Sequence, residues 1–335
     1  MADVAARVGV SKMTVSRALN GGGSSRSTSA ALRQRILAAC SDMGYVIDQT
    51  ARTFSSKRSG FVAVLVPTLN NSNFSETLHG LTAAVEAAGL QLLLGYTDYS
   101  IATEERLIKT MLMRRPEGLV LTGGSHTPAA RAMVLASRIP VVETWDLPVE
   151  PLAHAVGFSN ADAVAAMVHH LYARGRRRIA FVGGVAGRDA RGDDRRRGYG
   201  RAIAELGLPE GRVFSLGRAP VPMAQGIESV ALVLQQWPEV DGIVFVSDPP
   251  AFGAMMECQR RGWAVPQRVA IAGFGDFEVA RACHPRLTTI AVDCESIGRQ
   301  AGELLLRAID AARRAEPLPA ETVVIAYRVE VREST

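Results

Sequence analysis

The 335-residue sequence has few of the features that mark secreted, membrane-bound or metal-binding proteins. Its four cysteines, Cys40, Cys258, Cys283 and Cys294, have neither the spacing of a zinc site nor that of a redox pair, so we interpret them as buried thiols. No apolar run approaches the roughly 18 residues of a membrane helix, and the N-terminus has no signal-peptide core. These absences predict a cytoplasmic globular protein.

The sequence also lacks the motifs of common catalytic sites. FVGGVAG follows an apolar run with glycines, but it has neither the G-x-G-x-x-G spacing nor the acidic partner of a dinucleotide site, and no G-x-x-x-x-G-K-S run is present. His169 and His170 are adjacent on a predicted helix and point about 100° apart, and the other histidines are scattered. We therefore expect a non-enzyme that holds no metal and no cofactor.

Positive charge is concentrated at one end of the chain. Residues 1–60 contain nine Lys or Arg and three acidic residues, whereas the remainder has 29 basic and 30 acidic residues. The overall composition, 47% hydrophobic and 21% charged, is typical of two or three globular domains. A basic end on a near-neutral body favours phosphate binding through counterion release at that end.

The stretch DVAARVGVSKMTVSRALN, residues 3–20, predicts two short helices across a tight turn at Gly9. Apolar residues recur at helical spacing on both sides of the turn, and Ser11 is placed to cap the second helix. Two such stripes that face each other make a helix-turn-helix, although an ordinary helical hairpin would show the same stripes. The face of the second helix that points away from the packing is formed by Lys12, Met13, Ser16, Arg17 and Asn20.

A third helix is predicted for residues 31–43 and closes a small helical headpiece, residues 1–47. Its expected packing stripe is Leu32, Ile36, Leu37 and Cys40. Residues 48–60, DQTARTFSSKRSG, are a polar linker by composition.

From residue 61 onward, continuous apolar runs alternate with amphipathic helical patterns. The runs are FVAVLVP, QLLLGY, GLVLTGG and IPVVET and, after a polar stretch near residue 160, RRIAFVGG, DGIVFVS and RVAIAGF. Strands that are apolar on both faces indicate parallel sheets covered by helices. The sequence predicts an α/β core of two doubly wound lobes, with the ligand site in the cleft between them.

DVAARVGVSKMTVSRALN closely resembles the DNA-binding headpiece of the LacI family of bacterial repressors. The resemblance implies base-edge contacts for Lys12, Met13 and Arg17, and phosphate contacts for Ser11, Thr14 and Ser16. Long cationic side chains can reach guanine acceptors, whereas short hydroxyls reach only the backbone. Family members carry a few residues before the position of Asp3, so we expect the first helix to fray or the natural start to lie upstream.

In the LacI family the segment that matches residues 48–60 is a hinge helix that orders on DNA. The resemblance places Phe54 as an apolar wedge in the minor groove, with Arg52, Lys57 and Arg58 at phosphates. An exposed phenylalanine in a basic linker is otherwise hard to explain, so we favour the hinge over a plain linker.

The LacI family core has the periplasmic sugar-binding fold, in which the chain crosses three times between the lobes. The resemblance places the crossings near residues 158–161, 291–294 and 317–321. It divides residues 61–335 into a first lobe, about 61–159 plus 293–318, and a second lobe, about 160–292 plus 319–335.

Candidate effector residues follow predicted strands. They are Asn73, Phe74, Ser75, Asp146 and Asn160 from the first part of the core, and Arg195, Ser247, Asp248 and Asp276 from the second. Phe74 matches an aromatic that stacks on the effector in family members, although a core role fits it equally well. Arg195 matches the family's effector-binding arginine in the pattern R-x-x-G-Y.

Most family members place an aspartate after the phenylalanine of AGF, where this chain has Gly275. The loss of one acid beside an arginine favours an anionic effector over a neutral sugar. ETWDLP, VGFSN, MECQRRG and AIAGF also resemble the gluconate-operon repressors within the family. We therefore expect a sugar acid, gluconate or 2-ketogluconate.

These features predict a repressor that binds a palindromic operator on double-stranded DNA as a homodimer and is released by its effector. Two alternatives are a periplasmic-type sugar-binding protein without regulatory DNA binding, and a regulator that uses a neutral sugar or a corepressor. A tetramer is not expected, because the chain ends at Thr335 without a heptad tail.

Overall fold

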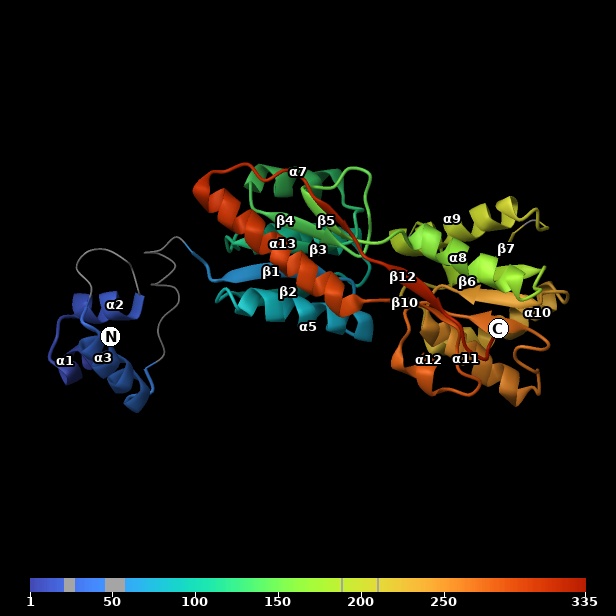
Figure 1. The fold of residues 1–335 in the computed structure, drawn as a ribbon, viewed down its shortest axis with the longest axis horizontal. Helices are drawn as coiled ribbons and strands as arrows, with labels where there is room; N and C mark the ends of the chain where they lie inside the picture. Colours follow the sequence, from blue (N-terminus) through green and yellow to red (C-terminus); the bar gives the residue numbers. More distant parts are fainter. Residues whose placement is uncertain (21–27, 46–57, 188, 210) are drawn as a thin grey trace. The chain divides into compact units, whose positions relative to one another are not determined.

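The computed structural model describes residues 1–20, 28–45, 58–187, 189–209 and 211–335. They form two compact units, Met1–Ser59 and Gly60–Thr335, drawn in Figure 1. Arg52, Phe54 and Lys57 of the predicted hinge lie outside the described residues.

Within its described residues the first unit contains three helices around a small apolar core: α1 (Ala2–Val8), α2 (Lys12–Asn20) and α3 (Ala30–Asp42). Gly9 ends α1 in the left-handed conformation (φ 73°), and the Ser29 hydroxyl caps α3 by accepting a hydrogen bond from Leu32 N at 3.3 Å. Val4, Val15 and Ile36 are fully buried where the helices meet. The expected packing role of Leu37 is wrong, because its side chain is 46% exposed.

The core unit begins with a parallel sheet in the order β11-β5-β4-β3-β1-β2. Its strands are β1 (Phe61–Val66), β2 (Gln91–Tyr96), β3 (Gly118–Thr122), β4 (Val141–Thr144), β5 (His154–Gly157) and β11 (Thr322–Val324). The helices of this lobe are α5 (Ser72–Glu86), α6 (Ile101–Leu112), α7 (Pro128–Ser137) and α13 (Cys294–Arg314).

Helices cover both faces of this first sheet. Along β1, Val62 and Val64 join the core that includes Leu81 of α5, whereas Ala63 and Leu65 pack on the other face with residues of α6 and α7. Side chains alternate between the faces of a strand, so a strand buried on both sides must be apolar throughout. The continuous apolar runs of the sequence follow from this arrangement.

The second lobe contains a parallel sheet in the order β7-β6-β8-β9. Its strands are β6 (Ile179–Gly184), β7 (Arg212–Leu216), β8 (Gly242–Phe245) and β9 (Ala270–Ala272). Its helices are α8 (Asn160–Ala173), α9 (Ala190–Glu205), α10 (Met223–Gln236), α11 (Asp248–Arg260) and α12 (Glu278–Ala282). The predicted fold class, two parallel-sheet lobes with a helix-turn-helix headpiece, is confirmed.

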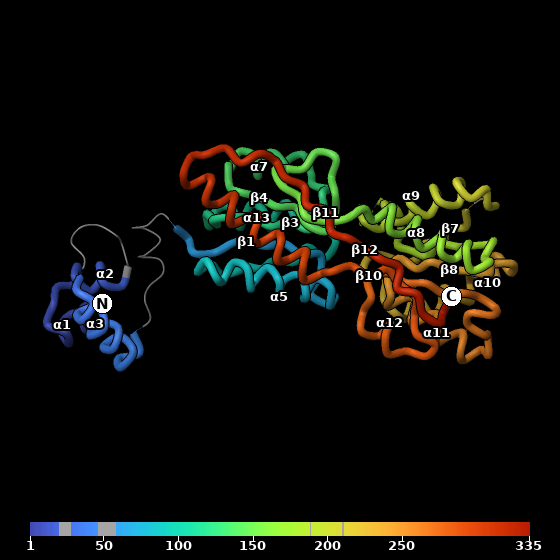
Figure 2. The backbone as a smooth tube through the Cα atoms, viewed as in Figure 1, coloured from blue at the N-terminus to red at the C-terminus, as the bar shows by residue number. Residues whose placement is uncertain are grey.

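Three chain segments connect the lobes, and Figure 2 traces them. The first lies between β5 and α8, and the second joins β10 (Thr289–Val292) to α13. The third crossing comes later than expected, because Thr322–Val324 still pair with β5 and Ile325 N donates to Gly157 O at 2.7 Å. The chain then enters β12 (Tyr327–Glu330), which pairs antiparallel with β10. Residues 319–325 were therefore wrongly assigned to the second lobe.

No helix in the described ranges is long and apolar enough to cross a membrane.

Candidate functional site

The exposed side of α2 contains the side chains that were predicted to read bases. Lys12, Met13 and Arg17 are exposed, Met13 by 62%, and Arg17 Nη2 donates to Met13 Sδ at 3.1 Å. Val15 and Ala18 on the opposite side are buried against the other two helices. The helix therefore presents two long cationic side chains, Lys12 and Arg17, to solvent.

The predicted phosphate contacts lie at and after the start of this helix. Ser11 Oγ accepts from Thr14 N at 3.2 Å and lies 2.9 Å from Thr14 Oγ1, so the two hydroxyls form one cluster at the helix N-terminus. Ser16 is half-buried one turn further on, and Asn20 is the last residue of α2. A helix N-terminus with exposed hydroxyls is suited to bind a phosphate.

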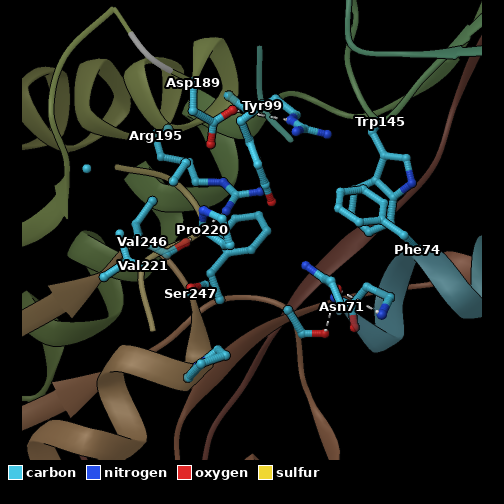
Figure 3. Close-up of a pocket in the computed structure, with 18 of the residues that line it drawn as sticks. Asn71, Phe74, Tyr99, Trp145, Asp189, Arg195, Pro220, Val221, Val246 and Ser247 are labelled. Atoms are coloured by element: carbon cyan, nitrogen blue, oxygen red, sulfur yellow. Dashed lines mark hydrogen bonds and ion pairs between the residues drawn. The ribbon is translucent and has the colours of Figure 1, made fainter. Parts of the chain in front are cut away.

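A cavity of about 110 Å³ lies between the two lobes of the core unit, and we call it the interlobe pocket (Figure 3). It is bounded by segments that follow β1, β2 and β4 of the first sheet and β6 to β9 of the second. Its polar and aromatic lining consists of Asn70, Asn71, Asn73, Phe74, Tyr99, Trp145, Asp189, Arg191, Asp193, Arg195, Ser247, Phe274 and Phe277. The carboxyl ends of parallel strands are where ligands bind in this class of fold.

Arg195 of α9 is held rigidly in the pocket wall. Its Nε donates to Asn160 Oδ1 at 2.9 Å, its Nη1 donates to the carbonyl of Val246 at 2.8 Å, and its Cζ lies 3.6 Å from the centroid of the Phe274 ring. Burial lowers the pKa of Arg195 to about 10, which leaves it charged at neutral pH. Among the described residues its Nη2 has no hydrogen-bond partner.

Arg191 places a second guanidinium at the pocket, and its role was not predicted from the sequence. It precedes Arg195 by four residues and so lies on the same face of α9. Its residue exposure is 7%, its Nε is 3.6 Å from Asp189 Oδ1, and its Cζ is 5.4 Å from the Phe74 ring centroid. The i, i+4 spacing in ARGDDRRRGYG was the signal that could have revealed it.

The first lobe contributes an aromatic wall. Phe74 and Trp145 meet edge to face with ring centroids 5.1 Å apart, and Trp145 Nε1 donates to Thr77 Oγ1 at 3.1 Å. Trp145 and Tyr99 both have positive φ, 70° and 55°, which is uncommon for non-glycine residues and tends to occur at functional sites. Burial raises the pKa of Tyr99, so its hydroxyl stays protonated.

A hydrogen bond joins the two lobes at the edge of the pocket. Asn73 Nδ2 donates to the carbonyl of Gly275 at 2.9 Å, and Gly275 has φ 124°. A Cβ at position 275 would lie 2.8 Å from Asn73 Nδ2 and 2.5 Å from the Phe277 ring. Ser247 also lines the pocket, and its hydroxyl makes no capping bond to α11.

Other predicted effector residues do not line the interlobe pocket. Ser75 is exposed on α5, with its hydroxyl 3.5 Å from the carbonyl of Asn71. Asn160 is buried behind the wall, where it orients Arg195 and donates from Nδ2 to the carbonyl of Trp145 at 3.1 Å. Asp146 is 9% exposed and accepts from Leu147 N at 2.9 Å, and burial raises its pKa.

Asp248 and Asp276 are also absent from the pocket lining, because other parts of the second lobe bind their carboxylates. Asp248 accepts from Thr289 Oγ1 at 2.6 Å and from Phe277 N at 2.8 Å, and burial raises its pKa to about 7. Asp276 pairs with Arg281 at 2.8 Å and with Arg332 at 2.6 Å. Both aspartates fix the segments around β10 and are not placed to touch a ligand in this pocket.

Comparison with known proteins gives matches for both units. Residues 1–48 match the bacterial regulatory proteins of the lacI family, and residues 168–335 match the periplasmic binding protein-like domain. An HTH-type transcriptional regulator GntR from Pseudomonas aeruginosa is 41% identical over 92% of this chain and 88% of its own length. The regulator of the same name from Escherichia coli K12 is 36% identical over 92% of this chain and 91% of its own.

Solved structures show the same likeness. The transcription regulator GntR from Chromobacterium violaceum has a TM-score of 0.76 and 35% identity, and the match covers 82% of this chain and 98% of that one. A lac repressor dimer bound to operator and an anti-inducer has a TM-score of 0.83 at 21% identity, covering 99% and 98% of the two chains. The second match supports the fold alone.

Proposed function

Because the chain belongs to the LacI family of bacterial transcriptional regulators, we propose that it represses by binding a palindromic operator as a homodimer, and that a sugar acid in the interlobe pocket releases it. Gluconate and 2-ketogluconate are the proposed effectors. The names of the two GntR relatives are consistent with this choice.

The observation that carries the proposal is the charge of the pocket wall. Arg195 is half-buried and protonated, and its Nη2 has no hydrogen-bond partner among the described residues, while Gly275 in the lining brings no carboxylate. The acidic residues in the lining pair with other cations, Asp189 with Arg191 at 3.6 Å and Asp193 with Arg196 at 3.7 Å, so the charge of Arg195 is left unbalanced. An anion would gain from the charge of Arg195, and Asn70, Asn71 and Ser247 supply polar groups for hydroxyls.

The DNA-binding proposal rests on α2. Lys12, Met13 and Arg17 would read base edges, and the Ser11–Thr14 hydroxyl cluster would hold a phosphate. A single helix-turn-helix contacts one half-site, so a second copy of the chain is needed for a palindrome. The hinge residues Arg52, Phe54 and Lys57 remain part of the proposal as minor-groove and phosphate contacts.

Effector and DNA would be linked through the arrangement of the lobes. Phe74 and Tyr99 come from the first lobe and Arg195 from the second, so a ligand that touches all three favours the arrangement seen here. In a dimer this arrangement would change the spacing of the two hinge segments and with it the free energy of ordering them on DNA.

Two measurements test the proposed function. Calorimetry with gluconate and 2-ketogluconate, and with glucose and ribose as controls, should show binding of the acids alone, and binding of a neutral sugar alone would overturn the sugar-acid assignment. Deletion of residues 1–59 should abolish operator binding and preserve effector binding, since the core is a separate compact unit. Operator binding by the isolated core would contradict the role of the headpiece.

A further inference from the structure

The guanidinium of Arg191 is buried at the interlobe pocket with most of its hydrogen-bonding capacity unused. Its Nε lies 3.6 Å from Asp189 Oδ1, whereas its Nη1 is fully buried and has no hydrogen-bond partner among the described residues. Its Nη2 likewise makes no hydrogen bond within the part of the chain that the structure describes. A buried charged donor without a partner is costly, which indicates that something else satisfies it.

The two arginines of the pocket differ in what they can offer a ligand. Arg195 uses Nε and Nη1 within the protein and keeps one free nitrogen, Nη2. Arg191 keeps Nη1 and Nη2 together, which is the pair that makes two parallel hydrogen bonds to a carboxylate. Arg195 can add a single bond to a neighbouring oxygen.

The surroundings of Arg191 also favour an anion. It lies in the first turn of α9, a helix whose N-cap residue, Asp189, makes no capping bond with its side chain, so the helix N-terminus adds positive potential. Arg191 and Arg195 repel each other electrostatically: burial is the main cause that lowers the pKa of Arg195, Asp189 opposes it, and the charge of Arg191 lowers the pKa further. A carboxylate between them would offset this repulsion.

We propose that Arg191 is the specificity-determining residue that recognises the effector's carboxylate through Nη1 and Nη2, while Arg195 binds an adjacent hydroxyl. This inference rests on the proposed function of the same pocket and names the residue that separates a sugar acid from the neutral polyol of the same length. A purely structural role, in which Arg191 packs against Phe74 and Tyr99, would make no such distinction.

The test compares gluconate with D-glucitol, which has the same six-carbon chain with a hydroxyl in place of the carboxylate. Calorimetry on the full-length chain should show wild type preferring gluconate. Arg191→Met should weaken gluconate binding by roughly 10- to 100-fold, to the affinity of D-glucitol, without weakening D-glucitol itself. Arg195→Met should weaken both ligands.

Two further variants make the result decisive. Arg197→Met is the matched control, because Arg197 is on the same helix, pairs with Asp194 at 2.6 Å and does not line the pocket; it should bind both ligands like wild type. Arg191→Lys keeps the charge and much of the packing but lacks the paired Nη1 and Nη2 donors, so it should lose part of the preference for gluconate. This variant tests the role of Arg191 even if Arg191→Met fails to fold.

A failure of the role assigned to Arg191 can be distinguished from a failure of the sugar-acid function. If a folded Arg191 variant keeps the wild-type ratio of gluconate to D-glucitol affinity, Arg191 does not read the carboxylate. If wild type binds D-glucitol as tightly as gluconate, or binds neither, the proposed sugar-acid function itself fails.

Discussion

Replacement of Gly275 by alanine tests whether contact between the lobes is coupled to effector binding. Gly275 has φ 124°, its carbonyl accepts from Asn73 Nδ2 at 2.9 Å across the lobes, and its N donates to Ile290 O at 2.8 Å. An added Cβ would lie 2.8 Å from Asn73 Nδ2 and 2.5 Å from the Phe277 ring, so both side chains must move.

Two contributions to the free energy can be separated at this position. A non-glycine residue in this backbone region costs about 1–3 kcal/mol, and this strain applies whether or not a ligand is bound. Displacement of Asn73 removes one hydrogen bond between the lobes, worth about 1 kcal/mol. The first contribution lowers stability, whereas the second weakens only the arrangement in which the lobes meet.

We therefore expect Gly275→Ala to lower the thermal midpoint of the core by several degrees and to weaken gluconate binding by roughly fivefold. Thermal unfolding and calorimetry measure the two effects. Gly262→Ala is the control, because Gly262 also has positive φ (68°) but no atom within 4 Å of the added Cβ. It should lower stability and leave gluconate affinity unchanged. Equal gluconate affinities for the two variants would refute the coupling.

Two other substitutions probe the headpiece and the first lobe. Arg17→Ala should weaken operator binding by roughly 1–3 kcal/mol and relax the base preference at one position of the operator. Affinities for operators with single base changes measure this effect. Equal weakening at every operator position would contradict a base contact. The side chain of His126 is 1% exposed and is hydrogen-bonded to Glu104 at 2.9 Å and to Glu143 at 3.1 Å. Burial lowers the pKa of His126, but the hydrogen bonds to the two carboxylates outweigh burial and raise the pKa to about 9. The stabilisation of the fold by protonated His126 should be complete below about pH 6.5 and should fall by up to about 3 kcal/mol as pH rises through about 9. The free energy of unfolding of His126→Gln, measured with denaturant, should lack this pH dependence. Equal pH dependence in wild type and variant would exclude the cluster of His126, Glu104 and Glu143 as its source.

Sequence reasoning predicted the strands that are buried on both faces. The runs at 61–67, 118–124 and 177–184 are apolar because helices cover both sides of each sheet. The strands that it missed include β5 and β7. β5 has only four residues and includes His154, and β7 is an edge strand in which exposure alternates along Arg212–Leu216. Neither segment shows the continuous apolar pattern.

The candidate site was predicted less completely than the fold. Of the predicted effector residues, Asn73, Phe74, Arg195 and Ser247 line the pocket. A polar residue after a strand can face either the cleft or the neighbouring loops, and the orientation of its side chain depends on its hydrogen-bond or ion-pair partner.

For the two buried aspartates that partner is remote in sequence. Asp248 is bonded to Thr289 and Asp276 to Arg332, partners 41 and 56 residues away, which spacing along the chain does not reveal. Arg191 was not predicted, because it lies in the charged run RGDDRRR, where the sequence alone does not show which side chains are buried.

We propose that a sugar acid bound between the lobes releases the dimer from its operator. Fluorescence anisotropy of full-length protein on DNA from its own upstream region measures this directly, with gluconate, 2-ketogluconate and D-glucitol added in turn. The acids should lower operator affinity, D-glucitol should not, and the Arg191→Met protein should stay bound to DNA in the presence of gluconate. Release by D-glucitol, or tighter binding in the presence of gluconate, would contradict the proposal.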